Sequence, residues 1–444
     1  MKSQHTLYIS GFIAAVLMFS SCKPKFDEKS SAGSADFSRY ISVGNSLTAG
    51  YADGGLYRAG QENSYPSMIA AQMKSVGGGT FSQPLFSTDQ ANGSGYLKLT
   101  GFDKSGLPVT APVTTGLAVR GIVNIPGYGN VTTYTKYSGD IDNYGVPGIK
   151  LLHITSTTYG NLNGYFERML PGEAGTNTTA YLDFVTAKPF TFFSNWLGNN
   201  DVLSYATTGG AGDVLTDKAT FAALYQSLIT KLTANGAKGV CATIPDVSAI
   251  PYFNTVTPAL VLATVQASNP TVKAIYISAK TNANASDNTY AARAATPSDH
   301  LILTFPTSLI GSTVSSPVGN VPYGLTPYAP IENKYVLDSS EVVITRDYIA
   351  SYNNTIESVA GAAGLAVADM NAYLNKIAAG GILENGMSLN AAYISGGLFS
   401  LDGVHLTPRG YAVVANEFIK AINQKYSASV PLVNTSAYGG VKFP

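Results

Sequence analysis

Charged residues are scarce in this chain, where Asp, Glu, Lys and Arg together make up 12% of 444 residues. Their signs also balance, because 27 basic and 27 acidic side chains give a formal net charge of zero. A nucleic-acid-binding surface needs a basic stripe that displaces counterions from phosphates. The composition therefore argues against nucleic acid as a partner, and it gives no reason to expect an acidic substrate.

Cysteine and histidine are also rare. The two cysteines are Cys22 and Cys241. Cys241 lies in an apolar run and is interpreted as a small buried side chain, so a disulfide between the two is the less favoured reading. Neither His153 nor His300 has an acidic or cysteine neighbour at the spacing of a metal site, and both are interpreted as structural. We therefore expect no metal and no cofactor.

The N-terminus has the pattern of an export signal. A short positive start precedes a mostly apolar run of 13 residues, Leu7 to Phe19, which is too short to span a bilayer as a helix. Residues 1–21 are therefore predicted to be a signal peptide that is not part of the fold. The alternative of a transmembrane anchor is disfavoured by the length of the run.

The residue after this signal is Cys22, which follows two small serines. This arrangement resembles the lipidation motif of bacterial lipoproteins, and the alternative is a plain secretory signal with an incidental cysteine. The polar residues 22–36 are predicted to be a tether. We expect an exported lipoprotein, held by a lipid on Cys22 at the bacterial outer membrane or cell surface, on the periplasmic or extracellular side.

Residues 37–430 are predicted to form one α/β domain. The expected strands are Phe37 to Val43, Pro189 to Trp196, Gly239 to Ile244 and Leu365 to Asp369, and the expected helices are Tyr65 to Lys74, Thr216 to Ala234, Asp347 to Ala363 and Pro408 to Tyr426. Strands that alternate with helices predict a parallel sheet with helices on both faces. Two stretches rich in Gly, Thr, Tyr and Pro, about 75–140 and 250–340, are interpreted as insertions, and residues 431–444 as a C-terminal tail.

A candidate nucleophile lies in the first strand-to-helix connection, Val43-Gly44-Asn45-Ser46-Leu47. A serine that opens a helix after a strand lies at the carboxyl end of the sheet, where backbone N–H groups point at the attacked group. Alone, this pattern is more typical of a simple helix cap.

Two further segments offer groups that could bind an anion. Gly148 ends Asn143-Tyr144-Gly145-Val146-Pro147-Gly148, which is predicted to be a turn, and its N–H is open to approach because glycine has no side chain. Asn200 follows a predicted buried strand in Gly198-Asn199-Asn200-Asp201, and its amide could donate a hydrogen bond, although an ordinary turn is the alternative.

The fourth segment is Asp402-Gly403-Val404-His405, just before the last predicted helix. An aspartate three residues before a histidine can hold the imidazole in one tautomer, and His405 could then accept a proton from Ser46. The alternative is that both side chains bond only to the local backbone.

In this order the four segments resemble the blocks of the SGNH, or GDSL-type, hydrolase family. Gly44-Asn45-Ser46-Leu47 matches the first block with Asn45 in place of the usual aspartate, Gly148 matches the second, Gly198-Asn199-Asn200-Asp201 the third, and Asp402-Gly403-Val404-His405 the fifth. The resemblance implies a flavodoxin-like three-layer α/β/α sandwich with a parallel sheet. The insertion between Ser46 and Gly148 makes this spacing long for the family.

The resemblance also implies the roles of the residues. Ser46 would be the nucleophile, His405 its base and Asp402 the partner of His405, with an oxyanion hole made by the Ser46 and Gly148 N–H groups and the Asn200 side chain. The expected function is a serine esterase that acts on acylated glycans or other small acyl esters. The alternatives are a lipase or phospholipase acting on lipid esters, and a surface-binding lipoprotein without turnover.

Overall fold

The computed structural model describes residues 30–102 and 108–444, and Ser31–Pro444 form one compact unit. The predicted signal peptide at 1–21 and the lipidation candidate Cys22 lie outside the described residues. Within the described ranges, no helix is long and apolar enough to cross a membrane.

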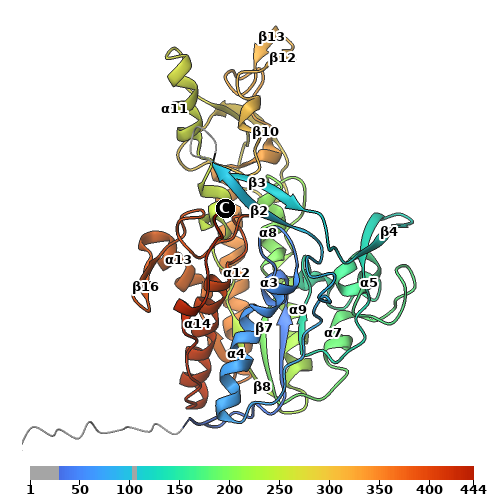
Figure 1. The fold of residues 1–444 in the computed structure, drawn as a ribbon. Coiled ribbons are helices and arrows are strands. Elements are labelled where there is room, and N and C mark those ends of the chain that lie inside the picture. Colours follow the sequence, from blue (N-terminus) through green and yellow to red (C-terminus); the bar gives the residue numbers. More distant parts are fainter. Residues whose placement is uncertain (1–29, 103–107) are drawn as a thin grey trace, which may run out of the picture. The chain divides into compact units, whose positions relative to one another are not determined.

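A parallel sheet of five strands forms the centre of this unit (Figure 1). In spatial order the strands are β15 (Ala366–Ala368), β8 (Lys238–Ala242), β7 (Phe192–Trp196), β1 (Tyr40–Gly44) and β6 (Asn143–Gly145). The first strand, β1, pairs in parallel with β6 on one side and with β7 on the other. The chain thus adds strands on both sides of β1, which creates a switch point where the carboxyl ends of the strands open a crevice.

Helices cover both faces of this sheet. They are α4 (Tyr65–Met73) and α14 (Pro408–Tyr426) on one face, and α9 (Lys218–Thr233) and α12 (Ser339–Ala362) on the other. The Trp196 ring of β7 lies 5.7 Å from the Phe418 ring of α14. The preceding residue, Asn195, donates a hydrogen bond to the Tyr225 hydroxyl of α9 at 3.1 Å. Since successive side chains of a strand point to opposite faces, these contacts put α14 and α9 on opposite sides of the sheet.

The two helices on each face also pack on one another through aromatic rings. Tyr65 of α4 stacks on Phe418 of α14 with ring centroids 4.7 Å apart. On the other face, Phe221 of α9 stacks on Tyr352 of α12 at 3.8 Å. All four side chains are fully buried, so the core consists of two apolar layers, one on each side of the sheet.

The predicted α/β arrangement with a parallel sheet is confirmed, with shifts at some element ends. Helix α14 has the predicted bounds, with Pro408 at its first position, where the missing N–H of proline costs nothing. Helix α12 begins at Ser339, well before the predicted Asp347. Asp338 caps this helix, and the Glu341 carboxylate accepts a hydrogen bond from the Asp338 N–H, so a capping box fixes the earlier start.

One strand differs from the prediction. Asn143–Gly145 was predicted to lie in a turn, but these residues form the edge strand β6, and the turn follows at Pro147 and Gly148. The strand has three residues and contains a buried polar Asn143. A strand this short and polar has no alternating apolar pattern by which the sequence could indicate it.

The two predicted insertions contain mainly short hairpins. The first holds β2 (Tyr96–Phe102) with β3 (Pro108–Val113) and β4 (Val119–Ile125) with β5 (Gly129–Tyr134), and the second holds α10 (Pro251–Asn254), α11 (Pro258–Ser268), β9 (Tyr276–Lys280), β10 (Tyr290–Ala294), β11 (His300–Leu301), β12 (Thr313–Ser316), β13 (Gly319–Pro322) and β14 (Val336–Leu337). Figure 1 shows α11 and the β12–β13 hairpin together in one lobe.

The remaining elements connect or flank these parts. They are α2 (Ser46–Ala49), α3 (Arg58–Glu62), α5 (Tyr159–Leu162), α6 (Gly164–Glu167), α7 (Tyr181–Val185), α8 (Asn200–Thr207), α13 (Met370–Gly380), β16 (Ile382–Glu384) and β17 (Met387–Leu389). The predicted tail packs on α14, because the Asn416 side chain both donates to the Val433 carbonyl and accepts from the Val433 N–H.

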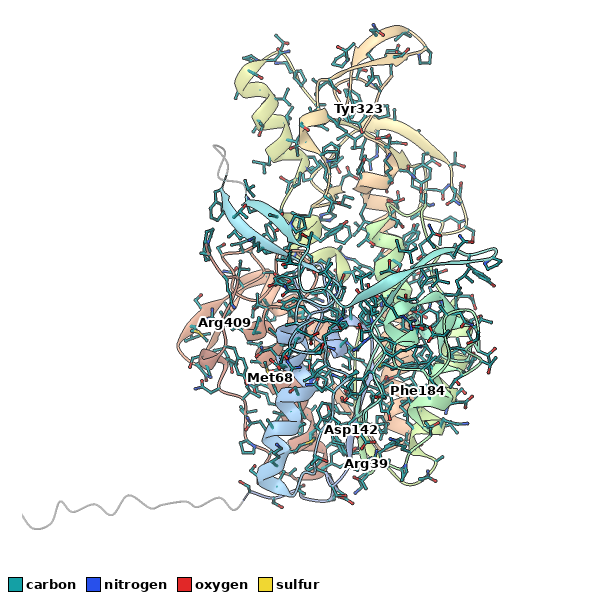
Figure 2. All side chains as sticks on the ribbon, turned by 45° about the vertical axis from the view of Figure 1, so that its right-hand side comes forward. Arg39, Met68, Asp142, Phe184, Tyr323 and Arg409 are labelled. Carbon is teal, nitrogen blue, oxygen red and sulfur yellow. The ribbon has the colours of Figure 1, made fainter. Side chains whose placement is uncertain are left out.

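The two ends of the sheet differ in what covers them (Figure 2). Arg39 and Asp142 precede β1 and β6 and form an ion pair of 3.7 Å at the amino end of these strands. Tyr323, which belongs to the second insertion, lies in the lobe at the opposite end of the picture. The lobe of the second insertion therefore lies toward the carboxyl end of the strands, where the candidate residues lie.

Candidate active site

Ser46 follows β1 through a tight turn. Gly44 is required in that turn, because a Cβ on it would clash with the Thr48 side chain and lie 3.2 Å from the Trp196 carbonyl oxygen. The Asn45 side chain accepts a hydrogen bond from the Leu47 N–H at 3.1 Å and so caps α2. This helix has four residues, so its dipole contributes little, and the turn itself fixes the position of Ser46.

The structure brings Ser46, His405 and Asp402 into one hydrogen-bonded chain. The Ser46 Oγ lies 2.8 Å from His405 Nε2, and His405 Nδ1 lies 2.9 Å from Asp402 Oδ2. These distances join residues 359 positions apart in the sequence. The arrangement puts a hydroxyl, an imidazole and a carboxylate in the order that serine hydrolysis requires.

Asp402 is held as a carboxylate by its surroundings. Its Oδ1 accepts hydrogen bonds from the N–H groups of Val404 and His405, at 2.9 and 2.8 Å. Burial by itself would raise the pKa of Asp402, but the adjacent His405 ring and these hydrogen bonds outweigh burial and lower that pKa below its usual value. Asp402 is therefore charged at neutral pH and favours the His405 tautomer with its proton on Nδ1, which leaves Nε2 free to accept a proton from Ser46.

The loop that contains Asp53 and Gly54 supports Asp402, although no sequence motif marks it. The Gly54 N–H donates to Asp402 Oδ2 at 2.8 Å, and the Asp53 carboxylate accepts from the Leu401 N–H at 3.0 Å. Asp53 adopts a positive φ of 53°, which is uncommon for a residue other than glycine. Since these partners lie almost 350 positions apart, no local pattern connects them.

The predicted oxyanion donors lie on connected segments. Asn200 is the first residue of α8, and its side-chain Nδ2 donates a hydrogen bond to the Ile149 carbonyl at 2.9 Å. Ile149 directly follows Gly148, which is exposed and has a φ of +83° that favours glycine. One N–H of the Asn200 amide thus anchors the Gly148 turn, and the second remains for another acceptor.

Asp201 fixes the same turn from the other side. Its carboxylate accepts from the Leu151 N–H at 2.7 Å and from the Thr216 hydroxyl at 2.6 Å. Burial raises the pKa of Asp201 to about 6, although these hydrogen bonds oppose the rise. Asn200 and Asp201, consecutive residues after β7, therefore hold the segment that carries Gly148.

A mostly apolar pocket opens beside Ser46, with about 540 Å³ of empty volume including its mouth. Its apolar lining comes from Leu47, Trp196, Leu203, Pro245, Val247, Ile250, Leu374, Phe399, Val404 and Leu406. Its polar lining comes from Ser46 and His405 together with Asn45, Asn199 and Asn200. The pocket therefore suits an apolar group attached to the carbon that Ser46 would attack.

A second, wider groove reaches His405 and Asp402 from the insertions. Leu97 and Thr110 line it from the β2–β3 hairpin, and Tyr252 and Leu303 line it from the second insertion. Both insertions therefore wall the approach to the candidate site.

The other residues considered from the sequence lie apart from this chain of hydrogen bonds. His153 stacks on Tyr159, and burial lowers the pKa of His153 to about 4, while His300 Nδ1 lies 2.9 Å from the Phe253 carbonyl oxygen. Cys241 is buried, and burial raises the pKa of its thiol to about 11. Within 30–102 and 108–444, no cluster of three or more His, Cys, Asp or Glu side chains could hold a metal ion.

Comparison with known proteins adds little to this geometry. No family model and no curated protein matches the chain. Among solved structures, the chain is similar to LAE5, an α/β hydrolase enzyme from the metagenome of Lake Arreo, Spain, with 12% identity and a TM-score of 0.36 over 88% of this chain and 96% of that one. A likeness at this level carries no argument about fold or activity, so the functional assignment depends on the site itself.

Proposed function

We propose that this chain is a serine hydrolase that cleaves carboxylic esters, with Ser46 as nucleophile, His405 as general base and Asp402 as the partner of His405. The single observation that carries the proposal is the continuous hydrogen-bonded path from the Ser46 Oγ through the His405 ring to the Asp402 carboxylate. Supporting it, Ser46 and His405 both line an apolar pocket.

In the proposed reaction the Ser46 Oγ attacks the ester carbonyl carbon while its proton moves to His405 Nε2. The tetrahedral intermediate collapses, the bond to the alcohol oxygen breaks, and His405 returns the proton to the departing alcohol. Water then attacks the acyl-enzyme, again losing a proton to His405, which gives it back to Ser46 as the acid leaves. Asp402 stays ionised throughout and stabilises the imidazolium.

The proposed oxyanion hole consists of the Ser46 and Gly148 N–H groups and the Asn200 side chain. Its support is that Asn200 lines the same pocket as Ser46 and also bonds to the residue after Gly148. Donors fixed in advance stabilise the developing charge without having to reorganise. The hydrogen bonds of Asn200 and Asp201 supply that rigidity.

We further propose membership of the SGNH, or GDSL-type, family and a flavodoxin-like sandwich. Taken in the order in which the chain enters them, the strands lie 2-1-3-4-5 across the sheet, which is the order of flavodoxin-like folds. Asn45 stands where the family has aspartate, and its side chain still caps the turn of Ser46. Export and lipidation of Cys22, with attachment to a membrane, remain part of the same proposal.

The apolar pocket favours acyl groups longer than acetyl. Such groups occur in lipid esters as well as in small acyl esters, so the pocket fits both the esterase and the lipase alternative. Burying one CH₂ group contributes about 0.8 kcal/mol, so each methylene that enters the pocket strengthens binding. An acyl chain longer than acetyl would contact the apolar side chains of this lining.

A panel of esters tests the proposed activity. We expect p-nitrophenyl butyrate to octanoate to be cleaved with kcat/KM values about tenfold or more above that of the acetate, because longer acyl groups fill the pocket. Acetylated sugars and a phospholipid belong in the same panel, with Ser46→Ala as the background. No serine-dependent turnover of any ester would overturn the enzyme proposal and favour a binding lipoprotein. A clear preference for acetylated sugars would contradict the acyl pocket, and a preference for phospholipid would favour the lipase.

A further inference from the structure

The wide groove that reaches His405 from the two insertions has no part in the proposed reaction so far. Its empty volume is about 1310 Å³ including its mouth, against about 540 Å³ for the apolar pocket beside Ser46. Sites that enclose drug-sized molecules span about 300 to 1,000 Å³. The groove is therefore large enough for a part of the substrate far bigger than a methyl or ethyl group.

Both walls of the groove are bonded to the segments that carry the candidate catalytic residues. In the second insertion, the Tyr252 N–H donates at 3.0 Å to the carbonyl of Gly403, the residue after Asp402. In the first insertion, the Leu97 N–H donates at 2.7 Å to the carbonyl of Asp53, whose loop supports Asp402. These backbone bonds fix the walls relative to Asp402, so a ligand does not have to order them when it binds.

The groove and the apolar pocket meet at the candidate base. Val404 and His405 line both cavities, whereas Ser46 lines the apolar pocket. In ester hydrolysis the acyl group stays on the serine, while the alcohol leaves with a proton from the histidine. This division places the acyl group in the pocket beside Ser46 and the alcohol on the other side of His405, in the groove.

Four aromatic rings line the groove, and they belong to Tyr51, Tyr252, Phe305 and Tyr393. The three tyrosines are half-buried, so part of each side chain is accessible in the folded chain. The Tyr51 ring lies 4.6 Å from the His405 ring. The Tyr51 hydroxyl donates to the Gly54 carbonyl at 2.7 Å, and the Tyr393 hydroxyl is likewise paired with a backbone carbonyl. What these two side chains offer a ligand is therefore mainly their rings.

The groove has little charge with which to bind an ionic group. Among the described residues that line it there is no lysine, arginine or glutamate, and the one aspartate is Asp402. The Asp402 carboxylate already accepts hydrogen bonds from Gly54 and from the His405 ring, so it is not free to bind a cation. A phosphate or carboxylate in the groove would lack a counterion, which favours a neutral ligand.

The groove also has few side-chain groups for a polyhydroxylated ligand such as a sugar. Among the described residues that line it there is no asparagine or glutamine, and the aliphatic hydroxyls are those of Thr110, Thr255, Thr304 and Thr307. The Thr255 hydroxyl donates to the Pro251 carbonyl at 2.7 Å. Hydroxyl groups that leave water without new partners weaken binding, so the lining favours an alcohol that is largely apolar.

We propose that this groove binds the alcohol part of the ester, and that the preferred alcohols are bulky, neutral and largely apolar, with aryl alcohols as the best class. The proposal rests on the proposed ester hydrolysis and adds an alcohol specificity to it. Aromatic rings of a ligand pack favourably against the tyrosine rings of the walls and remove apolar surface from water.

The test keeps the acyl group constant and changes the alcohol. It compares methyl, benzyl and 2-naphthylmethyl butyrate with 6-O-butyryl-glucose and butyrylcholine by titrating the acid released. The methyl and the two arylmethyl alcohols are similar leaving groups, so differences among their esters report contacts of the alcohol. For the wild-type protein, we expect kcat/KM for the naphthylmethyl ester to be about tenfold or more above that for the methyl ester, with the benzyl ester between them.

Two variants of Tyr252 separate the ring from its hydroxyl. In Tyr252→Ala, the ratio of kcat/KM for the naphthylmethyl ester to that for the methyl ester is expected to fall by about three- to tenfold, because one ring of the wall is lost. In Tyr252→Phe, which keeps the ring, the ratio is expected to stay at the wild-type value. A merely structural role of Tyr252 would lower both esters alike and leave the ratio unchanged.

A variant of the opposite wall gives an independent measurement. Leu97→Ala removes apolar surface from the β2–β3 side, so the same ratio is expected to fall, by about two- to fivefold. Tyr328→Ala is the matched control, because Tyr328 is a tyrosine of the second insertion that is 57% exposed and does not line the groove. It is expected to keep the wild-type ratio, and a thermal melt shows that each variant is folded.

Three results would overturn the proposal. The first is a wild-type ratio of about one or less, which would mean that the groove does not take the alcohol. The second is a kcat/KM for the glucose or choline ester above that for the naphthylmethyl ester, which would assign the groove to a sugar or to a cation. The third is an unchanged ratio in both Tyr252→Ala and Leu97→Ala. All three leave ester hydrolysis intact, whereas the absence of turnover with any ester would remove the proposed function as well.

Discussion

Replacing Ser46 by alanine is expected to lower kcat for a good ester by about 10⁴- to 10⁶-fold, and replacing His405 by alanine is expected to cost nearly as much. The two side chains act as one unit, since the hydroxyl is a poor nucleophile unless the imidazole 2.8 Å away accepts its proton. In such units the effects of single and combined removal are far from additive. The double variant is therefore expected to fall to the same floor as the single variants.

These kinetics are measured with p-nitrophenyl butyrate for the wild type, both single variants and the double variant, each with a thermal melt to show that it is folded. Ser75→Ala and His300→Ala are matched controls, because Ser75 is exposed beyond α4 and His300 lies in the second insertion. Both controls are expected to keep most of the activity. Single variants that retain more than a tenth of wild-type kcat, or a double variant far below both, would contradict the coupled pair.

Replacing Asn200 by alanine is expected to lower kcat by about 10²- to 10³-fold with little change in KM. Removal of one oxyanion donor has this effect because the donor stabilises the transition state more than the bound ester. Asn200 also bonds to the Ile149 carbonyl, so its loss loosens the Gly148 turn as well. The expected loss is therefore at the upper end of this range.

Asn161→Ala is the matched control for a buried asparagine that bonds to backbone groups, in this case those of Asn177, because Asn161 does not line the pocket beside Ser46. It is expected to lower the melting temperature without a comparable fall in kcat for the remaining folded protein. A fall of less than tenfold in Asn200→Ala, or a change confined to KM, would mean that Asn200 is not an oxyanion donor.

The parts of the fold that could be predicted are those encoded locally. Helix α14 could be bounded because Pro408 suits the first position of a helix and because apolar residues recur along its length. The start of α12 is also encoded locally, in the capping box of Asp338 and Glu341, but the predicted helix began too late, at Asp347. The edge strand β6 was missed because three residues carry no periodicity.

The candidate site was predictable to the extent that each residue follows a strand or opens a helix. Ser46 and Asn200 come after β1 and β7, and the carboxyl ends of parallel strands share one edge of the sheet. The contacts that support Asp402 could not be predicted, because Asp53 and Gly54 reach it only through the folded chain.

The most direct test of the account is covalent labelling by a fluorophosphonate probe, which reacts with a serine only when a neighbouring base activates it. The account predicts one adduct per chain, found by peptide mass spectrometry on Ser46, absent in Ser46→Ala and formed far more slowly in His405→Ala. An adduct on another serine, or continued ester hydrolysis by a wild-type protein that the probe does not label, would contradict the claim that Ser46 is the nucleophile.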